Sequence, residues 1–318
     1  MKREFKPLDL SKVKTYSIKA RKSKVSLRDF SRPYAPGSSF KQFLEGLPQI
    51  LAAQNLKEVV DALAQAKRQH RVIVVGMGAH PIKVGLNPLL IQLMEKGVID
   101  CLAMNGAGII HDLELALAGK TSEEVEESLE GGAFGMARET SVLLNDFITE
   151  GVKKGLGMGE AIGKRILSDD FPNRQYSLLA TGARLGIPVT VHVAIGTDII
   201  HMHPSANGGA IGEGSLRDFQ KLTAVVAQLQ RGVYLNIGSA VILPEVFLKA
   251  LTLARNLGHE VQGFTTVNMD FIQHYRPTTN VVKRPTQQSG RGYTLIGHHE
   301  IMFPLLVAAL LEELRESI

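Results

Sequence analysis

From Arg71 onward, short apolar runs alternate with segments whose apolar residues have helical spacing. The runs RVIVVGMG (71–78) and DCLAMNGAG (100–108) end in glycines, and NPLLIQLMEKG (87–97) lies between them with a helical period. Strands that alternate with helices build βαβ units, so the pattern predicts an α/β fold with a mainly parallel sheet and helices on both faces. Further strands are predicted at 187–196, 233–238, 261–270 and 293–297.

The polar positions predict where several helices begin and end. Pro88 near the start and Gly97 at the end delimit the helix within 87–97. Thr121 and Glu124 have the spacing of a capping box, which predicts a helix in 121–132. Ile301–Leu311 is apolar throughout but too short to cross a bilayer, so it is expected to be part of a buried helix.

Charge separates the first residues from the remainder. Residues 1–32 contain eleven Lys/Arg and three Asp/Glu, a net charge of +8, although the whole chain carries only +5. We therefore expect a basic, extended arm at residues 1–35 and a single α/β domain at 36–318. The arm has few aromatic residues for base stacking, which favours a solvated tail or an arm wrapped on a neighbouring subunit over a nucleic-acid contact.

Composition narrows the class of protein. The 318 residues are 44% hydrophobic, enough for a large core, and the single cysteine, Cys101, excludes an internal disulfide. A reducing, cytoplasmic compartment is expected on that basis. The first residues also lack the apolar segment of a secretory signal.

The strand ends carry the candidate chemistry. Parallel sheets bind ligands beyond the carboxyl ends of their strands, where glycines admit backbone amides and helix N-termini favour phosphate. GMGAHP is not a full G-x-G-x-x-G motif, because Pro81 stands at the third glycine. The glycines therefore indicate either a nucleotide site or simple strand endings.

Histidines and acids cluster after the predicted strand 187–196. Asp198 follows the strand end and is a candidate for holding a cationic substrate, although a turn aspartate has the same pattern. His201 and His203 form an H-x-H pair that could bind a metal with His298, but no spacing fixes a third ligand.

The order of these motifs resembles the deoxyhypusine synthase family, including its homospermidine synthase branch. HHEIMFPLLVAALLEEL is similar to the family's closing nucleotide contact and its F-P-L-L-V-A helix. GVIDCLAMNGAGIIHDLELAL is similar to its T-A-G-G-x-x-E-D turn, and LGIPVTVHVAIGTDIIHMHPSANGG to its I-P-V strand. YLNIGSAVILPEVFLKALTLARNLGH looks like the family's glycine-rich turn and next helix, and the resemblance covers about residues 70–316.

The resemblance implies an NAD-dependent transferase that oxidises a polyamine and passes on an aminoalkyl group as an imine. It implies Lys283, in RPTTNVVKRP, as the imine-forming nucleophile, Glu245 as a second catalytic residue, and Asp198 with His203 as substrate ligands. It also implies a homo-oligomer, expected to be a tetramer, with a small amine as substrate, a protein as an alternative substrate, and no membrane partner. The residues expected to contact NAD are Gly76, Gly78, Ala79, His80, Asn105, Gly106, Ala107, Gly108, Gly196, Gly238, Ser239, Gly297, His298 and His299.

The sequence departs from the family around the polyamine pocket. The acidic loop before the lysine is shortened to MDFIQHYRPTTN, and Val281 replaces an aromatic residue. The family's catalytic histidine is replaced by Pro244 or, after a one-residue shift, Glu245. These changes predict an amine enzyme other than authentic deoxyhypusine synthase. Two alternatives remain: a metal-dependent hydrolase built on His201, His203 and His298, and a non-catalytic NAD-binding oligomer.

Overall fold

The computed structural model describes residues 2–315 and contains one sheet of six parallel strands in the order β3-β2-β1-β4-β5-β6. This is the strand order of the classical dinucleotide-binding fold, and it confirms the predicted α/β class with a parallel sheet. The strands are β1 (Ile73–Met77), β2 (Cys101–Asn105), β3 (Val189–His192), β4 (Val233–Ile237), β5 (Thr265–Asp270) and β6 (Arg291–Ile296).

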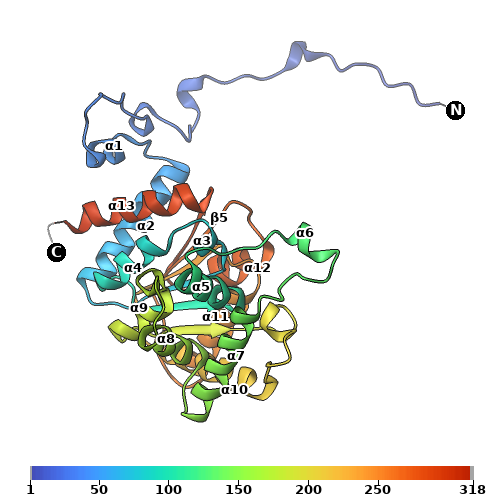
Figure 1. Ribbon diagram of the computed structural model, residues 1–318. Coiled ribbons are helices and arrows are strands. Elements are labelled where there is room, and N and C mark those ends of the chain that lie inside the picture. The colour runs from blue at the N-terminus through green and yellow to red at the C-terminus, as the bar shows by residue number, and fades with distance from the viewer. Residues whose placement is uncertain (1, 316–318) are drawn as a thin grey trace.

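Helices cover both faces of the sheet (Figure 1). One face packs on α2 (Leu51–Arg68), α4 (Asn87–Glu95), α5 (Gly106–Ala118), α7 (Arg138–Lys153), α8 (Met158–Ser168), α9 (Leu178–Leu185) and α13 (His299–Leu314). The other face packs on α10 (Gly208–Val226), α11 (Ile242–Asn256) and the π-helix η6 (Thr278–Lys283). The shorter helices are α1 (Phe40–Gly46), α3 (His80–Lys83), α6 (Val125–Leu129), α12 (Tyr275–Pro277), η4 (Arg174–Tyr176) and η5 (Ile199–His201).

Alternation within β1 explains how the sheet separates two cores. Ile73, Val75 and Met77 belong to the larger core, whereas Val74 belongs to the smaller one. Because successive side chains of a strand point to opposite faces, an uninterrupted apolar run is what a strand buried on both faces requires.

The N-terminal segment extends away from the body (Figure 1). It forms only three short 3-10 turns, η1 (Leu10–Lys12), η2 (Ile18–Ala20) and η3 (Leu27–Asp29), and its large apolar side chains are exposed. Its last part is tied to the body by hydrogen bonds from the Arg32 amide to the Gly46 carbonyl and from the Gln49 amide to the Asp29 carbonyl. Among the described residues, no helix has the length and apolar character needed to cross a membrane.

Two segments differ from the expectation. The predicted helix in 121–132 is reduced to α6, which begins at Val125 after Glu124, and Thr121 does not cap it. The segment between Arg276 and Gly292, rich in turn formers, contains the π-helix η6.

Candidate active site at the carboxyl ends of the strands

The loops that follow β1 and β4 touch each other at the centre of the sheet. The Gly78 amide donates to the Ile237 carbonyl at 3.0 Å, and a side-chain carbon on Gly78 would lie 2.3 Å from the Gly238 carbonyl oxygen. Gly238 has φ +63°, the left-handed region that favours glycine. The helices after these two strands, α4 and α11, cover opposite faces, so this is the topological switch point, where open parallel sheets bind ligands.

The turn after β2 starts a longer helix. Asn105 is the N-cap of α5, and its Oδ1 accepts the Gly108 amide at 3.1 Å. Gly106, the first residue of α5, lies directly against Asp198: a side-chain carbon there would be 2.0 Å from Asp198 Oδ2. The structure therefore brings together the NGAG turn and the aspartate that the sequence singled out.

Asp198 is held by the loop that follows β3. The amides of Gly196 and Asp198 donate to Nδ1 of His201 at 3.1 and 3.4 Å, and the Thr197 hydroxyl donates to Asp198 Oδ2 at 3.3 Å. Only 8% of Asp198 is exposed. Burial raises the pKa of its carboxyl group, against the opposing effects of His201 and the Thr197 hydroxyl.

A cavity of about 190 Å³ opens beside Asp198, between the end of α3, α5, the segment that carries α6 and the loop that follows β3. Its charged side chains are Lys83, Glu114, Glu123 and Asp198, with His111 beside them. The remaining lining residues are apolar or small: Ala107, Ile110, Ser122, Val125, Phe134, Thr197 and Ile199. Three carboxylates against one lysine give this cavity a negative lining.

Glu114 is fixed by hydroxyl groups. The hydroxyl of Thr121 donates to Oε2 and that of Thr140 to Oε1, and Thr121 also contacts Nδ1 of His111. Burial raises the pKa of Glu114, but the hydrogen bonds from His111, Thr121 and Thr140 outweigh it, so the pKa lies below its usual value. The side chain of Thr121, expected to cap a helix, instead orients a carboxylate of the cavity wall.

A cluster of rings lies at the ends of β1, β5 and β6. His80 and His299 have ring centroids 5.4 Å apart, and Phe271 stacks on His298 at 5.5 Å with an interplanar angle of 11°. Buried His299 shares a hydrogen bond of 3.1 Å between Nε2 and the Met269 carbonyl, whereas its Nδ1 has no hydrogen-bond partner within residues 2–315. Burial lowers the pKa of His299, so a neutral ring with a free acceptor nitrogen faces this end of the sheet.

The three histidines proposed as metal ligands do not lie together. His201 and His203 follow β3, whereas His298 follows β6, and these are the two outer strands of the sheet. Nδ1 of His203 is engaged by Ser205 at 2.8 Å. Within residues 2–315, no group of three or more His, Cys, Asp or Glu side chains could hold a metal ion, so the proposed trio was wrong as a ligand set.

The structure does not bring the two predicted catalytic residues to the Asp198 cavity. Lys283 is exposed, and the preceding carbonyl, of Val282, lies against Gly292 at the start of β6. That is the amino edge of the sheet, opposite Asp198. Glu245, in the first turn of α11, is bound by Lys249, by the Asn280 amide at 2.8 Å and by Arg276 at 3.4 Å.

Of the predicted nucleotide contacts, Gly76 lies inside β1 rather than at its end. A side-chain carbon on Gly76 would be 2.2 Å from the Tyr234 hydroxyl oxygen, so its packing accounts for the glycine. The strand-end residues fall into three groups. Gly78, Ala79, His80, Gly238 and Ser239 lie at the switch point, Asn105 to Gly108 with Gly196 lie near Asp198, and Gly297 to His299 begin α13.

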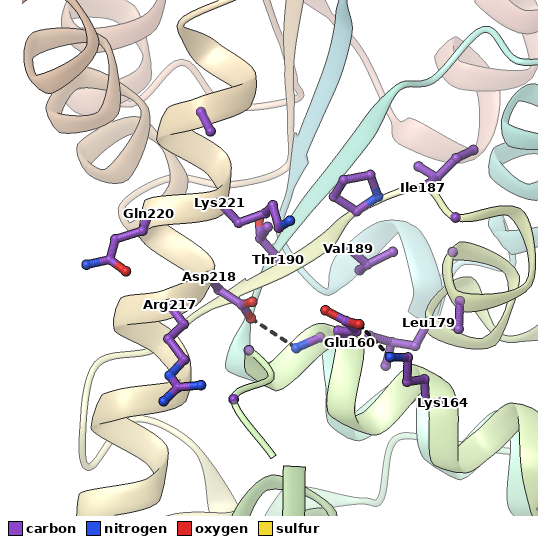
Figure 2. A pocket seen from close by; sticks show the side chains of 18 residues that line it. Glu160, Lys164, Leu179, Ile187, Val189, Thr190, Arg217, Asp218, Gln220 and Lys221 are labelled. Carbon is purple, nitrogen blue, oxygen red and sulfur yellow. Dashed lines mark hydrogen bonds and ion pairs between the residues drawn. The ribbon is translucent and has the colours of Figure 1, made fainter. Parts of the chain in front are cut away.

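A larger cavity, of about 630 Å³, lies elsewhere, beside the outer strand β3 (Figure 2). Asp218 enters it from α10, and Oδ2 accepts the amides of Gly159 at 2.9 Å and Val191 at 2.8 Å. Lys164 on its wall is paired with Glu160 at 2.6 Å. Its lining includes residues 187–190, at the amino end of β3, and Lys221 is its one charged side chain without a partner in residues 2–315. Parallel sheets bind ligands at the carboxyl ends of their strands, so we place the candidate active site there and not in this cavity.

Sequence reasoning missed Lys83, His111, Glu114, Glu123 and Phe271. The spacing of His111 and Glu114, three residues apart on one helix, was a readable signal that both face the same side. Glu123 and Lys83 gave no such signal, because their segments meet only in the folded chain.

No protein-family model and no curated protein matches the chain. Among solved structures, a LOR/SDH protein from Methanococcus maripaludis aligns with a TM-score of 0.53 at 14% identity, over 85% of this chain and 72% of that one. A deoxyhypusine synthase-like protein from Entamoeba histolytica aligns with a TM-score of 0.50 at 11% identity, over 87% and 96%. AgrE, in a ternary complex with ornithine and NAD+, aligns with a TM-score of 0.50 at 13% identity, over 85% and 35%.

These likenesses show a shared fold. The chain spans about a third of the length of AgrE and of the cyanobacterial arginine dihydrolase ArgZ. The expected similarity to a deoxyhypusine synthase structure is found, at low identity and together with amino-acid enzymes of the same fold.

Proposed function

We propose that the protein is an NAD-dependent enzyme that oxidises a small amine in the cavity beside Asp198. The observation that carries the proposal is the acidic cavity itself, which lies at the carboxyl end of the sheet, beside the start of α5 and the loop after β3. Structures of this fold include one bound to ornithine and NAD+ and one of the deoxyhypusine synthase type, which agrees with a nucleotide and an amine as ligands.

The residues of the strand ends fit a dinucleotide. The turns at Gly78–His80 and Gly238–Ser239 meet at the switch point, and His299 adds a buried nitrogen without a partner. The Phe271–His298 stack offers a ring surface to a planar base. The Asp198 carboxylate already lies at the start of α5, so its negative charge favours placing the pyrophosphate at the switch point rather than at Asn105–Gly108.

NAD would supply the hydride acceptor. The chain's own residues would bind the ammonium form of the amine, take up its proton and exclude water. Asp198 suits the first two tasks, because burial raises the pKa of its carboxyl group and so makes it a better base. Phe134, Val125 and Ile199 supply the apolar wall that limits access of water.

Transfer of the oxidised group to an acceptor would be a further step and needs a nucleophile. Lys283 is the residue implied by the family resemblance. It lies at the amino edge of the sheet, so in this proposal it serves the cavity of a neighbouring subunit, within a tetramer.

The test is amine-dependent formation of NADH with a panel of small amines, followed by the same assay on Asp198→Asn. Removing one partner of a buried charge pair costs about 2 kcal/mol or more, so kcat/KM should fall roughly 30-fold or further. Asp146→Asn, at an exposed aspartate of α7, is the matched control and should keep full activity. NAD reduction that survives in Asp198→Asn would refute the assignment.

A further inference from the structure

Two opposite charges on the wall of the 190 Å³ cavity lack ion-pair partners. Lys83, the last residue of α3, has no hydrogen bond or ion pair with any side chain in residues 2–315. Asp198 accepts one side-chain hydrogen bond, from Thr197, and forms no ion pair in that part of the chain. Glu123 forms no ion pair there either and accepts only the Gly135 amide, whereas Glu114 is held by Thr121 and Thr140.

The position of Lys83 follows from the backbone. Loop residues 78 and 79 lead from β1 into α3, which packs on α5, so the end of α3 lies over the first turns of α5. Lys83 is the only lysine or arginine among the described residues that line the cavity. A ligand that bears only ammonium groups would leave this cation facing another cation.

We propose that the cavity binds a diamino acid, with Asp198 holding an ammonium group and Lys83 holding the carboxylate. This inference rests on the proposed function and names its substrate class. Three carboxylates and one lysine match a ligand that has one carboxylate and a net positive charge. The cavity volume of about 190 Å³ suits a small molecule.

Glu123 completes the arrangement. Its Oε1 accepts the Gly135 amide at 2.7 Å, which fixes the carboxylate on the wall formed by the segment around α6. With Glu114 it provides a second acidic position for the distal ammonium group. Lys83 is thus a specificity-determining residue that selects diamino acids over the corresponding diamines.

The test compares the binding of two ligands that differ only in the carboxylate. L-Ornithine and 1,4-diaminobutane are titrated calorimetrically into the full-length protein, into Lys83→Met and into Lys96→Met, which removes an exposed lysine at the end of α4. The wild-type protein and Lys96→Met should bind ornithine about fivefold more tightly than the diamine, since Lys83 is exposed and an ion pair with an exposed lysine is worth up to about 1 kcal/mol. Lys83→Met should lose that preference and keep or improve its affinity for the diamine.

If the wild-type protein binds the diamine as tightly as ornithine or more tightly, the inference is overturned and the proposed amine chemistry remains. The same holds if Lys83→Met keeps the wild-type preference for ornithine. If Lys83→Met does not fold, Lys83→Gln takes its place. Its preference for ornithine over 1,4-diaminobutane is then compared with that of the wild-type protein. Binding of neither ligand would overturn both this inference and the proposed function. If the protein prefers ornithine but does not bind NAD, the result supports the diamino acid as substrate and refutes NAD as the cofactor.

Discussion

A methyl group on Gly106 would lie only 2.0 Å from Oδ2 of Asp198, so the first residue of α5 and this carboxylate are in direct contact. The contact requires glycine because it leaves no room for a side chain. It also fixes the carboxylate at the rim of the cavity, between the ends of β2 and β3.

Gly106→Ala should therefore displace Asp198 and weaken amine binding about tenfold or more, with the fold retained. Affinity for NAD should change little, because the proposed pyrophosphate position lies at Gly78–His80. Calorimetric titration of both ligands measures this. Gly212→Ala is the control, since a methyl group there meets nothing within 4 Å. An unchanged amine affinity in Gly106→Ala would count against the Asp198 site.

Lys283→Arg should keep the binding of NAD and of the amine, because Lys283 does not line the cavity beside Asp198, but it should lose group transfer. Arginine keeps the charge and cannot form an imine. Borohydride reduction in the presence of NAD and amine should trap an adduct on Lys283 of the wild-type protein, detected by peptide mass spectrometry.

Mixed oligomers can show whether Lys283 acts between subunits. Asp198→Asn and Lys283→Arg subunits, each inactive in transfer, should regain partial activity when combined, since one shared site then has both residues. Full transfer activity in Lys283→Arg alone would assign the lysine to an ordinary exposed position.

The free energy of unfolding should depend on pH because of the titration of Asp218. Burial raises the pKa of Asp218 from its ordinary value of 3.8 to about 7 in the folded chain. Between these pH values the folded state retains a proton that the unfolded state releases, so the residue's contribution to stability is greatest at low pH and falls as the pH rises. Three pKa units correspond to about 4 kcal/mol, as an order of magnitude.

Asp218→Asn removes this titration and keeps an oxygen that can accept both amides now bound to Oδ2. From about pH 4 to pH 7 the wild-type protein should lose free energy of unfolding relative to the variant, measured by urea denaturation at each pH. Asp146→Asn should show no such trend. A constant difference between wild type and Asp218→Asn across this range would contradict the assignment.

Deletion of residues 1–35 should reduce the size of the oligomer while leaving the α/β body folded. Ten large apolar side chains of this segment are exposed in the single chain, among them Phe5, Leu8 and Leu27, and such a segment needs a surface on which to lie. Light scattering compares the truncated chain with one that lacks only residues 1–4. If both have the same mass, the arm has no role in assembly.

The sheet was predictable because β1 to β4 are buried on both faces and therefore appear as short, mainly apolar runs, with glycines close behind them. Helix α2 was also readable, since Leu56, Val59, Val60 and Leu63 have helical spacing, although the sequence analysis assigned no element there. The π-helix η6 was not readable, because its residues suit turns equally well and its conformation depends on packing against β5, β6 and α11.

Asp198 could be predicted as a site residue from its position after a strand. Its partners could not, because Lys83, Glu114 and Glu123 come from three segments that line one cavity only in the folded chain. For Lys283 the sequence was misleading in the other direction. The family resemblance implied a catalytic nucleophile, but η6 places the residue at the amino edge of the sheet, away from the Asp198 cavity.

The capping of β3 by α10 limits the ways in which copies of the chain can join. On this outer strand, Asp218 binds the Val191 amide, and the Ser215 hydroxyl donates to the Val191 carbonyl at 3.0 Å. A strand from another molecule would find these groups already engaged. Growth into a continuous intermolecular sheet is therefore blocked on this side, and association through β3 would have to use side chains of the covering helices instead.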